Sequence, residues 1–370
     1  RVLESYVPAP VNVKVTNGRR TQALQLDARD AACVERARRL HSEVELRTPG
    51  QPVQFLNSSV VTGALPDSRF VQALTLRGEL DCPNLRALEG HPRFRFLRHD
   101  IGQPMPAEVL RMAPRITRVW NLACAASPPL YQRDPEHTML TNVVGTNHLL
   151  RLAESAGARF LLTSTSEVYG DPEIHPQAED YRGNVSCTGP RACYDEGKRA
   201  AEALTFDYGR AGRAQVRVAR IFNTYGPNMD PDDGRVVSNL ICQALRGSEM
   251  TVYGDGSQTR SFCYVSDMVA GLMALMDAEF DGMEPVNLGN PHEMTVNELL
   301  GHVVALTGTR ARVVHRPLPV DDPRRRRPDI SRAGALLGWA PRVPLAEGLD
   351  ATCAWFAEEL VAEPAAGVAG

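Results

Sequence analysis

Apolar and polar positions in the middle of the chain predict short strands separated by helices. Four apolar runs are typical of strands, at residues 94–97, 119–123, 159–163 and 216–221. Between the second and third runs, residues 136–156 carry apolar side chains at helical spacing and stop at Gly157. Strands joined by such helices form right-handed crossovers, so the pattern predicts an α/β fold with a parallel sheet.

Ligands of such a sheet bind at the carboxyl ends of its strands. Asp100, Ala123, Thr165 and Asn223 all fall at predicted strand ends. After Gly226 the alternation loosens, and helices are predicted at 236–246, 265–276 and 295–306, with a last one extending through Glu358.

The first eighty residues have a weaker pattern. Residues 11–15 alternate like a short strand, and residues 31–40 are compatible with a helix. Prolines at 49, 52 and 66 break the rest into short pieces. We interpret residues 1–45 as an irregular N-terminal extension.

Composition excludes several classes of protein. The chain is 43% hydrophobic and 23% charged, which is enough to bury a large core. A net charge of -3 gives no reason to expect a nucleic acid or membrane partner, and no apolar run is long enough to span a bilayer. The eight cysteines and nine histidines lack metal-ligand spacing, so no metal is expected. The scattered cysteines predict reduced thiols and a cytoplasmic location.

Tyr194 and Lys198 are four residues apart in a helix-compatible segment, so they share one helix face. An ammonium beside a phenol favours the phenolate and lowers the pKa of the tyrosine, which makes Tyr194 a candidate general base. The alternative is an ordinary surface pair on an amphipathic helix.

Five sequence segments, one of which contains this pair, favour the functional interpretation. Together they resemble the extended short-chain dehydrogenase/reductase family, and within it the UDP-glucuronic acid decarboxylases (UDP-xylose synthases), over residues 84–360. The segments lie at residues 164–172, 189–198, 219–227, 233–239 and 252–260.

The resemblance implies a Rossmann-like, doubly wound parallel sheet. Residues 46–222 would form the NAD-binding domain, and residues 223–360 a smaller nucleotide-sugar-binding domain interleaved with it. Residues 361–370 are expected to be a flexible tail. The family also implies a homodimer, formed through the helix that carries Tyr194 and its neighbour.

The resemblance assigns catalysis to Thr165, Glu167, Tyr194, Lys198 and Arg326. Tyr194 would remove the C4 hydroxyl proton while hydride passes to NAD, and the resulting β-keto acid would lose carbon dioxide. Glu167 and an arginine would orient the sugar and manage protonation at C5, before hydride returns to C4. Dehydratases of the family have an aspartate at the position of Ser166, whose hydroxyl cannot replace that acid.

The remaining site residues are also implied by the resemblance. Arg326 is selected from the run 324–327 by the pattern Arg-x-Pro-Asp, and the other three arginines are expected to be solvated. Arg235 has a surface salt bridge as its alternative, Asp100 a turn, and Leu122 and Ala123 plain packing. The substrate residues are Tyr131, Asn223, Arg235, Tyr253 and Arg260. The NAD residues are Asp100, Ile101, Leu122, Ala123, Tyr194 and Lys198.

The glycine-rich turn that holds a dinucleotide pyrophosphate is missing. Residues 48–58 and 60–64 are the nearest candidates, each with too few glycines. One hypothesis is a shifted reading frame, because codons for Arg38-Arg39-Leu40-His41, read one base over, spell Ala-Gly-Phe-Ile, a fragment of that turn. The other is divergence with weak or absent NAD binding.

Three alternative functions stay open. The enzyme could release the 4-keto pentose, or be another nucleotide-sugar epimerase or dehydratase. The lost turn also allows a non-catalytic nucleotide-sugar-binding relic.

Overall fold

The computed structural model describes residues 11–17, 20–26, 44–46, 58–65, 68–75, 94–280 and 283–362. The chain divides into two compact units, residues 1–44 and 45–370. In the first unit, β1 (Val11–Asn17) pairs antiparallel with β2 (Arg20–Leu26), so the strand predicted over residues 11–15 is confirmed. The helix predicted at 31–40 lies outside the described residues.

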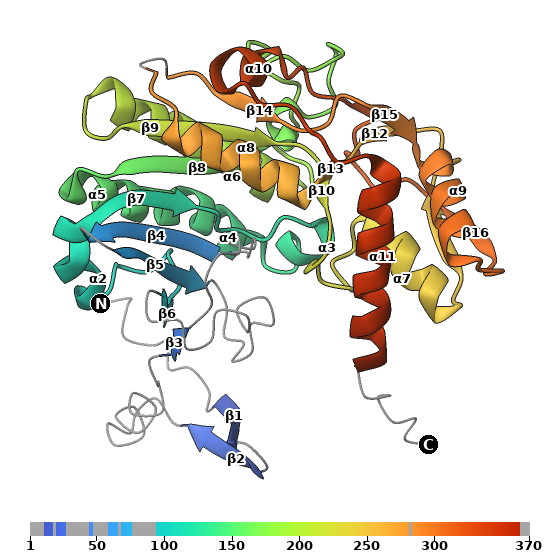
Figure 1. Cartoon of the computed structure of the whole chain (residues 1–370), viewed down its shortest axis with the longest axis horizontal. Coiled ribbons are helices and arrows are strands. Elements are labelled where there is room, and N and C mark those ends of the chain that lie inside the picture. The colour runs from blue at the N-terminus through green and yellow to red at the C-terminus, as the bar shows by residue number, and fades with distance from the viewer. Residues whose placement is uncertain are drawn as a thin grey trace. The chain divides into compact units, whose positions relative to one another are not determined.

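The second unit is built on an eight-stranded sheet (Figure 1). Its strand order is β14-β9-β8-β7-β4-β5-β6-β3. The first four strands in this order are mutually parallel, which confirms the doubly wound α/β class. The four strands predicted from apolar runs are β6 (Phe94–Arg98), β7 (Ile116–Asn121), β8 (Arg159–Thr165) and β9 (Val216–Ile221). The outer strands are β14 (Val286–Leu288) and β3 (Val44–Leu46).

One strand departs from the parallel pattern. β4 (Ser58–Leu65) runs antiparallel to both of its neighbours, β7 and β5 (Ser68–Thr75). β4 and β5 form a hairpin, and a connection that short cannot make a parallel crossover. The candidate glycine turn at 60–64 is therefore wrong, because these residues lie inside β4. The candidate at 48–58 lies outside the described residues except for Ser58, which begins β4.

Side chains of β8 alternate between two cores on opposite faces of the sheet. Phe160 and Leu162 pack with α5 and α6, whereas Leu161 packs with α8 and α10. Figure 1 shows α8 on the face opposite to α5 and α6. The helical stretch predicted at 136–156 is continuous but passes through a π-helical turn. The stretch consists of α4 (Pro135–Leu140), η3 (Thr141–Gly145) and α5 (Thr146–Ala156). The other helices that cover the sheet are α6 (Ala192–Arg210), α8 (Val265–Asp277) and α10 (Ser331–Leu337).

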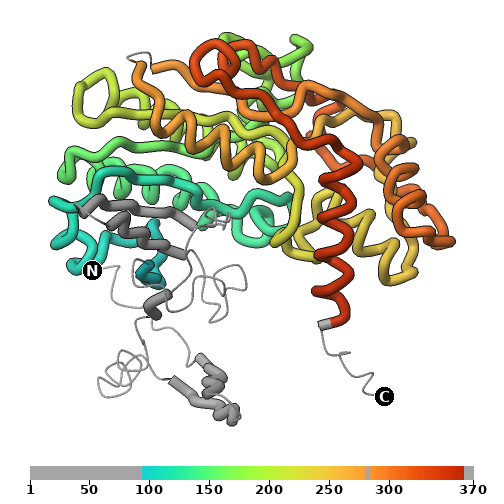
Figure 2. Tube along the Cα trace, viewed as in Figure 1, coloured from blue at the N-terminus to red at the C-terminus, as the bar shows by residue number. Residues whose placement is uncertain are grey.

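The C-terminal part packs three helices around a separate core. These are α7 (Val236–Arg246), α9 (Val296–Thr307) and α11 (Leu345–Ala362). The trace in Figure 2 shows how this part returns to the sheet through α8 and β14. None of the helices in the described ranges has the length and apolarity to cross a membrane.

Two of the three small sheets in the described residues of the C-terminal part contain residues predicted for the site. β11 (Met250–Tyr253) pairs with β16 (Val313–Arg316), and the second has the order β15-β12-β17. Its strands are β15 (Glu293–Thr295), β12 (Thr259–Ser261) and β17 (Arg325–Arg326). Short elements complete the described fold: α2 (Ala107–Met112), η2 (Ala113–Arg115), α3 (Pro128–Tyr131), η4 (Ser166–Tyr169), β10 (Thr224–Tyr225) and β13 (Cys263–Tyr264).

Candidate functional site

The carboxyl end of β8 delivers the first site residues. Thr165 is the last residue of the strand, and its hydroxyl accepts a hydrogen bond from the backbone N–H of Glu167 at 3.2 Å. This bond caps the short helix η4 and fixes Glu167 beside Thr165. Gly170, at φ +61°, ends the turn where a Cβ would lie 1.9 Å from the carbonyl oxygen of Asn184, so only glycine fits.

Helix α6 brings Tyr194 and Lys198 to the same edge. The Tyr194 phenol shares a hydrogen bond with Thr165, and its ring stacks on Tyr131 with centroids 4.9 Å apart. The Lys198 ammonium donates to the carbonyls of Thr163 at 2.9 Å and Ala123 at 3.3 Å. It lies 5.9 Å from the centre of the Tyr194 ring. The shared helix face predicted from their spacing is present, and both side chains are buried.

Burial changes the electrostatics of this pair. Burial raises the pKa of Tyr194, with a further contribution from Cys124, and the Thr165 hydrogen bond offsets only part of this. Burial also lowers the pKa of Lys198. The net shift of the Tyr194 pKa in this structure is therefore opposite to the lowering that the sequence predicted from Lys198. The physical reason is that the ammonium is directed at two backbone carbonyls, and desolvation outweighs its charge.

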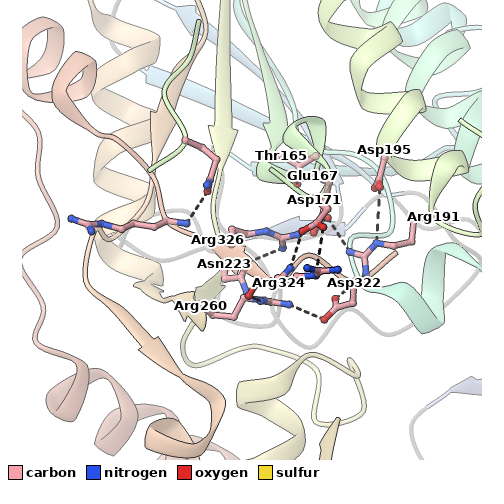
Figure 3. Close-up of polar contacts among 12 residues, drawn as sticks. Thr165, Glu167, Asp171, Arg191, Asp195, Asn223, Arg260, Asp322, Arg324 and Arg326 are labelled. Carbon is pink, nitrogen blue, oxygen red and sulfur yellow. Dashed lines mark hydrogen bonds and ion pairs between the residues drawn. The ribbon is translucent and has the colours of Figure 1, made fainter. Parts of the chain in front are cut away.

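Glu167 lies between two buried arginines (Figure 3). Its Oε2 accepts from Nη2 of Arg326 at 2.7 Å and from Nη2 of Arg191 at 2.9 Å. Arg326 comes from β17, 159 residues away in sequence, and Arg191 immediately precedes α6. The carboxylate thus joins three separate segments of the chain.

A second layer of polar contacts holds the two arginines. Arg326 also donates to Oδ1 of Asn223 at 3.2 Å. Arg191 also donates to Oδ1 of Asp322 at 3.2 Å, and the other oxygen of Asp322 accepts from Arg260 at 2.7 Å. Arg260 and Arg326 are paired residues on the neighbouring parallel strands β12 and β17, so the small sheet sets the spacing of their backbones.

The pKa values of the two buried acids move in opposite directions. Burial by itself would raise the pKa of Glu167, but the charges of Arg326 and Arg191 outweigh it and lower the pKa to about 2. Burial, together with the charge of Glu167, raises the pKa of Asp195 to about 8. Asp195 lies 4.0 Å from Nε of Arg191, too far for a hydrogen bond. The surroundings therefore favour the ionised form of Glu167 and the protonated form of Asp195.

The structure separates the predicted substrate residues into two groups. Arg326 and Arg260 are buried, and Asn223 contacts Arg326, while Tyr131 stacks on Tyr194. Arg235, by contrast, forms a local salt bridge with Asp233, the alternative that the sequence left open, and Tyr253 is exposed at the end of β11. Of the run 324–327, Arg326 is the buried member.

The predicted cofactor residues lie at the ends of β6 and β7. Oδ1 of Asp100 accepts from the backbone N–H of Gly102 at 2.8 Å, as a turn residue does, and Oδ2 pairs with His137 at 3.0 Å. Ile101 and Ala123 belong to the core, and Leu122 is half-buried. Lys198 bonds the carbonyl of Ala123, so these two predicted cofactor residues lie together.

Sequence reasoning missed Arg191, Asp195 and Asp322. Arg191 and Asp195 lie within the segment at residues 189–198 and are four residues apart on either side of Tyr194. That spacing was an available signal for an ion pair. Asp322 carried no such signal, because its partner Arg191 is 131 residues away.

Comparison with known proteins gives the family. The pattern of the NAD dependent epimerase/dehydratase family matches residues 74–289. UDP-glucuronic acid decarboxylase 6 from Arabidopsis thaliana is 54% identical over 266 residues, which cover 72% of this chain and 75% of that protein. UDP-glucuronic acid decarboxylase 1 from Danio rerio is 52% identical over 271 residues, 73% of this chain and 63% of the relative.

A solved structure with the same fold is UDP-glucuronic acid 4-epimerase from Bacillus cereus, in complex with UDP-glucuronic acid and NAD. It superposes with a TM-score of 0.67 at 26% identity, over 75% of this chain and 85% of the epimerase. The chain thus belongs to the NAD dependent epimerase/dehydratase family, and within that family its sequence is similar to the UDP-glucuronic acid decarboxylases.

Proposed function

We propose that this protein is an NAD-dependent UDP-glucuronate decarboxylase that forms UDP-xylose. The observation that carries the proposal is the meeting of two sets of side chains at the end of β8. Tyr194 and Thr165 share a hydrogen bond there, and Glu167 pairs with Arg326 directly beside them. The first set suits oxidation and reduction at a sugar hydroxyl, and the second suits a sugar that carries a carboxylate.

Tyr194, Lys198, Ala123, Leu122, Ile101 and Asp100 are the residues proposed to hold NAD. The Tyr194 and Lys198 end fits a nicotinamide ribose, because both side chains meet at the carboxyl ends of β7 and β8. When bound, NAD accepts a hydride from the sugar and later returns it. Tyr194, as the phenolate, takes the proton of the C4 hydroxyl, and Thr165 hydrogen-bonds the same oxygen.

The oxidised sugar is a β-keto acid, which explains the loss of carbon dioxide. The C5–C6 bond breaks, and its electron pair is delocalised onto the C4 oxygen. Tyr194 and Thr165 donate hydrogen bonds to this oxygen, where the negative charge develops. Carbon dioxide leaves, C5 takes a proton, and the C4 oxygen recovers its proton from Tyr194 when the ketone is reduced.

The nucleotide half of the substrate is assigned to the basic side chains near β12. Arg260 is proposed to bind the diphosphate together with Asn223, because a buried guanidinium matches phosphate oxygens. Arg235 and the exposed Tyr253 are proposed to contact the ribose and uracil, and Tyr131 the sugar.

The orientation of β4 favours a second candidate, a protein that binds the nucleotide sugar without catalysis. β4 is antiparallel and is followed by a hairpin, so it does not lead into a glycine turn and helix. The decarboxylase is the better supported function, since the side chains proposed to bind the sugar lie together in the described residues.

One assay on the full chain tests the proposal. The purified protein is incubated with UDP-glucuronate and NAD, and carbon dioxide, product mass and NADH are measured. Carbon dioxide with UDP-xylose and no net NADH is the expected result. The 4-keto pentose with stoichiometric NADH would identify the releasing decarboxylase instead. Binding of UDP-glucuronate without carbon dioxide would identify the non-catalytic protein.

Assembly and location are proposed on separate grounds. We propose a homodimer formed through α6 and its neighbour α5, as expected from the family resemblance, and light scattering of the purified protein tests it. A cytoplasmic location is supported by the six cysteines of the described residues, which are all unpaired thiols.

A further inference from the structure

The two arginines that hold Glu167 converge on a single oxygen atom. Arg326 and Arg191 approach Oε2 at 2.7 and 2.9 Å, and both side chains are buried. Each is also held independently of Glu167, Arg326 by Asn223 and Arg191 by Asp322. The guanidinium groups would therefore stay in place if another carboxylate replaced that of Glu167.

The charges around this pair leave room for one more anion. Arg191, Arg260 and Arg326 hydrogen-bond the carboxyl groups of Glu167 and Asp322. The third acid, Asp195, lies 4.0 Å from Arg191, and burial together with the charge of Glu167 raises its pKa to about 8. Three buried guanidinium groups thus share the two carboxylates that hydrogen-bond them, and buried charge is costly unless it is compensated. A bound carboxylate would compensate it.

Arg191 also borders open space. Together with Asp195, Gly170, Asp171, Ser186 and Asp321, it lines a cavity of about 200 Å³. Within that lining, Nε of Arg191 and Oδ1 of Asp195 are buried without a hydrogen-bond partner. The cavity thus reaches Arg191 but is not lined by Glu167 or Arg326, and the two buried atoms would need a small rearrangement to contact a ligand.

Resting on the function proposed above, we propose that Arg191 is a specificity-determining residue. With Arg326 it forms a two-guanidinium clamp, which Glu167 occupies and which the C6 carboxylate of UDP-glucuronate enters by displacing Glu167. The clamp recognises the one group that distinguishes a uronate from a neutral sugar. No role in substrate selection follows for Arg191 from its place in the sequence alone.

Displacement by the substrate carboxylate would also allow Glu167 to transfer a proton. A carboxyl held near pKa 2 by two guanidinium groups cannot deliver a proton at neutral pH. Once the substrate shares those charges, the pKa of Glu167 returns toward its ordinary range. Glu167 then relays to C5, after carbon dioxide leaves, the one solvent proton that the net reaction consumes. A sugar without a carboxylate would leave Glu167 locked in the clamp.

The test compares two ligands that differ only in the carboxylate. Calorimetry measures the Kd of UDP-glucuronate and of UDP-xylose on the NAD-loaded full chain with Tyr194→Phe as the common background, because this change is expected to stop turnover with little effect on binding. Arg191→Gln is expected to weaken UDP-glucuronate binding about tenfold or more and UDP-xylose about twofold or less, since a charge-assisted hydrogen bond contributes selectively to the anion. Arg191→Lys, which keeps the charge but not the fork, is expected to fall between.

Two further variants separate recognition from loosening of the fold. Arg199→Gln is the matched control: Arg199 lies on the same helix and donates to the carbonyls of Val168 and Arg182, but not to Glu167. It is expected to leave the ratio of the two Kd values unchanged. Glu167→Gln empties the clamp of its internal anion, so UDP-glucuronate is expected to bind as tightly as before or more tightly.

Equal weakening of both ligands by Arg191→Gln would overturn the inference and leave Arg191 a structural residue. Weaker UDP-glucuronate binding in Glu167→Gln would overturn the exchange. If Arg191→Gln does not fold, the Lys variant and Glu167→Gln decide the question. A wild-type protein that neither binds nor decarboxylates UDP-glucuronate would refute the proposed function itself, which is a different outcome.

Discussion

The site contains two buried regions with ionisable side chains. One region favours the neutral forms of its side chains, and the other favours the charged forms. Around Tyr194 and Lys198, desolvation is the largest influence, and it shifts both pKa values toward the neutral forms. Around Glu167, Arg191 and Arg326, opposite charges lie within 3 Å of each other, and the carboxyl is held ionised despite its burial. The two regions meet at Thr165.

The difference shows that burial alone does not set a protonation state. A buried acid stays charged where guanidinium groups are its partners, and a buried phenol or ammonium becomes harder to charge where its partners are backbone carbonyls or a hydroxyl. The first arrangement suits fixed recognition of an anion. The second suits a proton that must move during the reaction.

The largest effect is expected from Tyr194→Phe. The change removes the phenol hydroxyl beside Lys198 and leaves the ion pairs of Glu167 with Arg191 and Arg326 in place. Turnover of UDP-glucuronate is expected to fall by about 10² to 10⁴, with binding changed little. Rapid-quench measurement of carbon dioxide and calorimetry check the two parts. Unchanged turnover would show that the mechanism proposed for Tyr194 is wrong.

Glu167→Gln tests how much the ion pairs of Glu167 contribute to the free energy of unfolding. Removing one partner of a buried ion pair costs about 3–5 kcal/mol, so the free energy of unfolding is expected to fall at neutral pH. The folded pKa of about 2 lies below the ordinary value of 4.5. The stabilisation is therefore present above pH 4.5 and is lost as the pH falls toward 2. Chemical denaturation at pH 7 and pH 3 measures both, and an equal deficit at the two pH values would contradict the ion-pair account.

Asp195→Asn tests the neutral acid at the border of the two regions. Its folded pKa of about 8 lies above its ordinary value of 3.8, so its contribution to stability is lost as the pH rises from about 4 to about 8. Relative to wild type, the Asn variant is expected to lose less stability across this window, by up to about 1.4 kcal/mol per pH unit. Thermal unfolding from pH 5 to pH 9 measures it, and parallel pH profiles would refute it.

The smallest effect is expected from Tyr131→Phe. The Tyr131 hydroxyl is buried and has no hydrogen-bond partner, whereas its ring stacks on Tyr194. Removing the hydroxyl keeps the stack, so the free energy of unfolding is expected to change by about 1 kcal/mol or less. Tyr131→Leu is the control, because it removes the stack and is expected to cost more. Similar losses in both variants would show that the hydroxyl has a partner.

Much of the catalytic region could be predicted from sequence. The strand ending at Thr165 and the helix with Tyr194 and Lys198 follow from local patterns. The choice of Arg326 within its run follows from the family resemblance, and Arg326 is buried and bonds Glu167 beside Thr165. Arg191 was not assigned a role, because what matters is its contact with Glu167 and Asp322. These contacts link residues 24 and 131 positions apart.

In the fold, too, local features were predicted from the sequence and long-range ones were not. Periodicity predicts β7, β8 and β9 and their crossover helices, because alternation and helical spacing are local properties. The reversed direction of β4 was not predicted. It depends on its hairpin with β5 and its pairing with β7, and strand pairing is a long-range choice.

Local order along the chain thus decides which elements form and which reactive groups lie at their ends, since helix faces and strand ends are set by neighbours in sequence. Which groups are charged was decided only by the tertiary structure. Tyr194 and Lys198 have the spacing of an activated pair, yet burial moves both away from charge. Glu167 has the sequence context of a proton carrier, yet Arg191 and Arg326 hold it ionised. Desolvation and ion pairing depend on what packs around a side chain, and those partners come from distant parts of the chain.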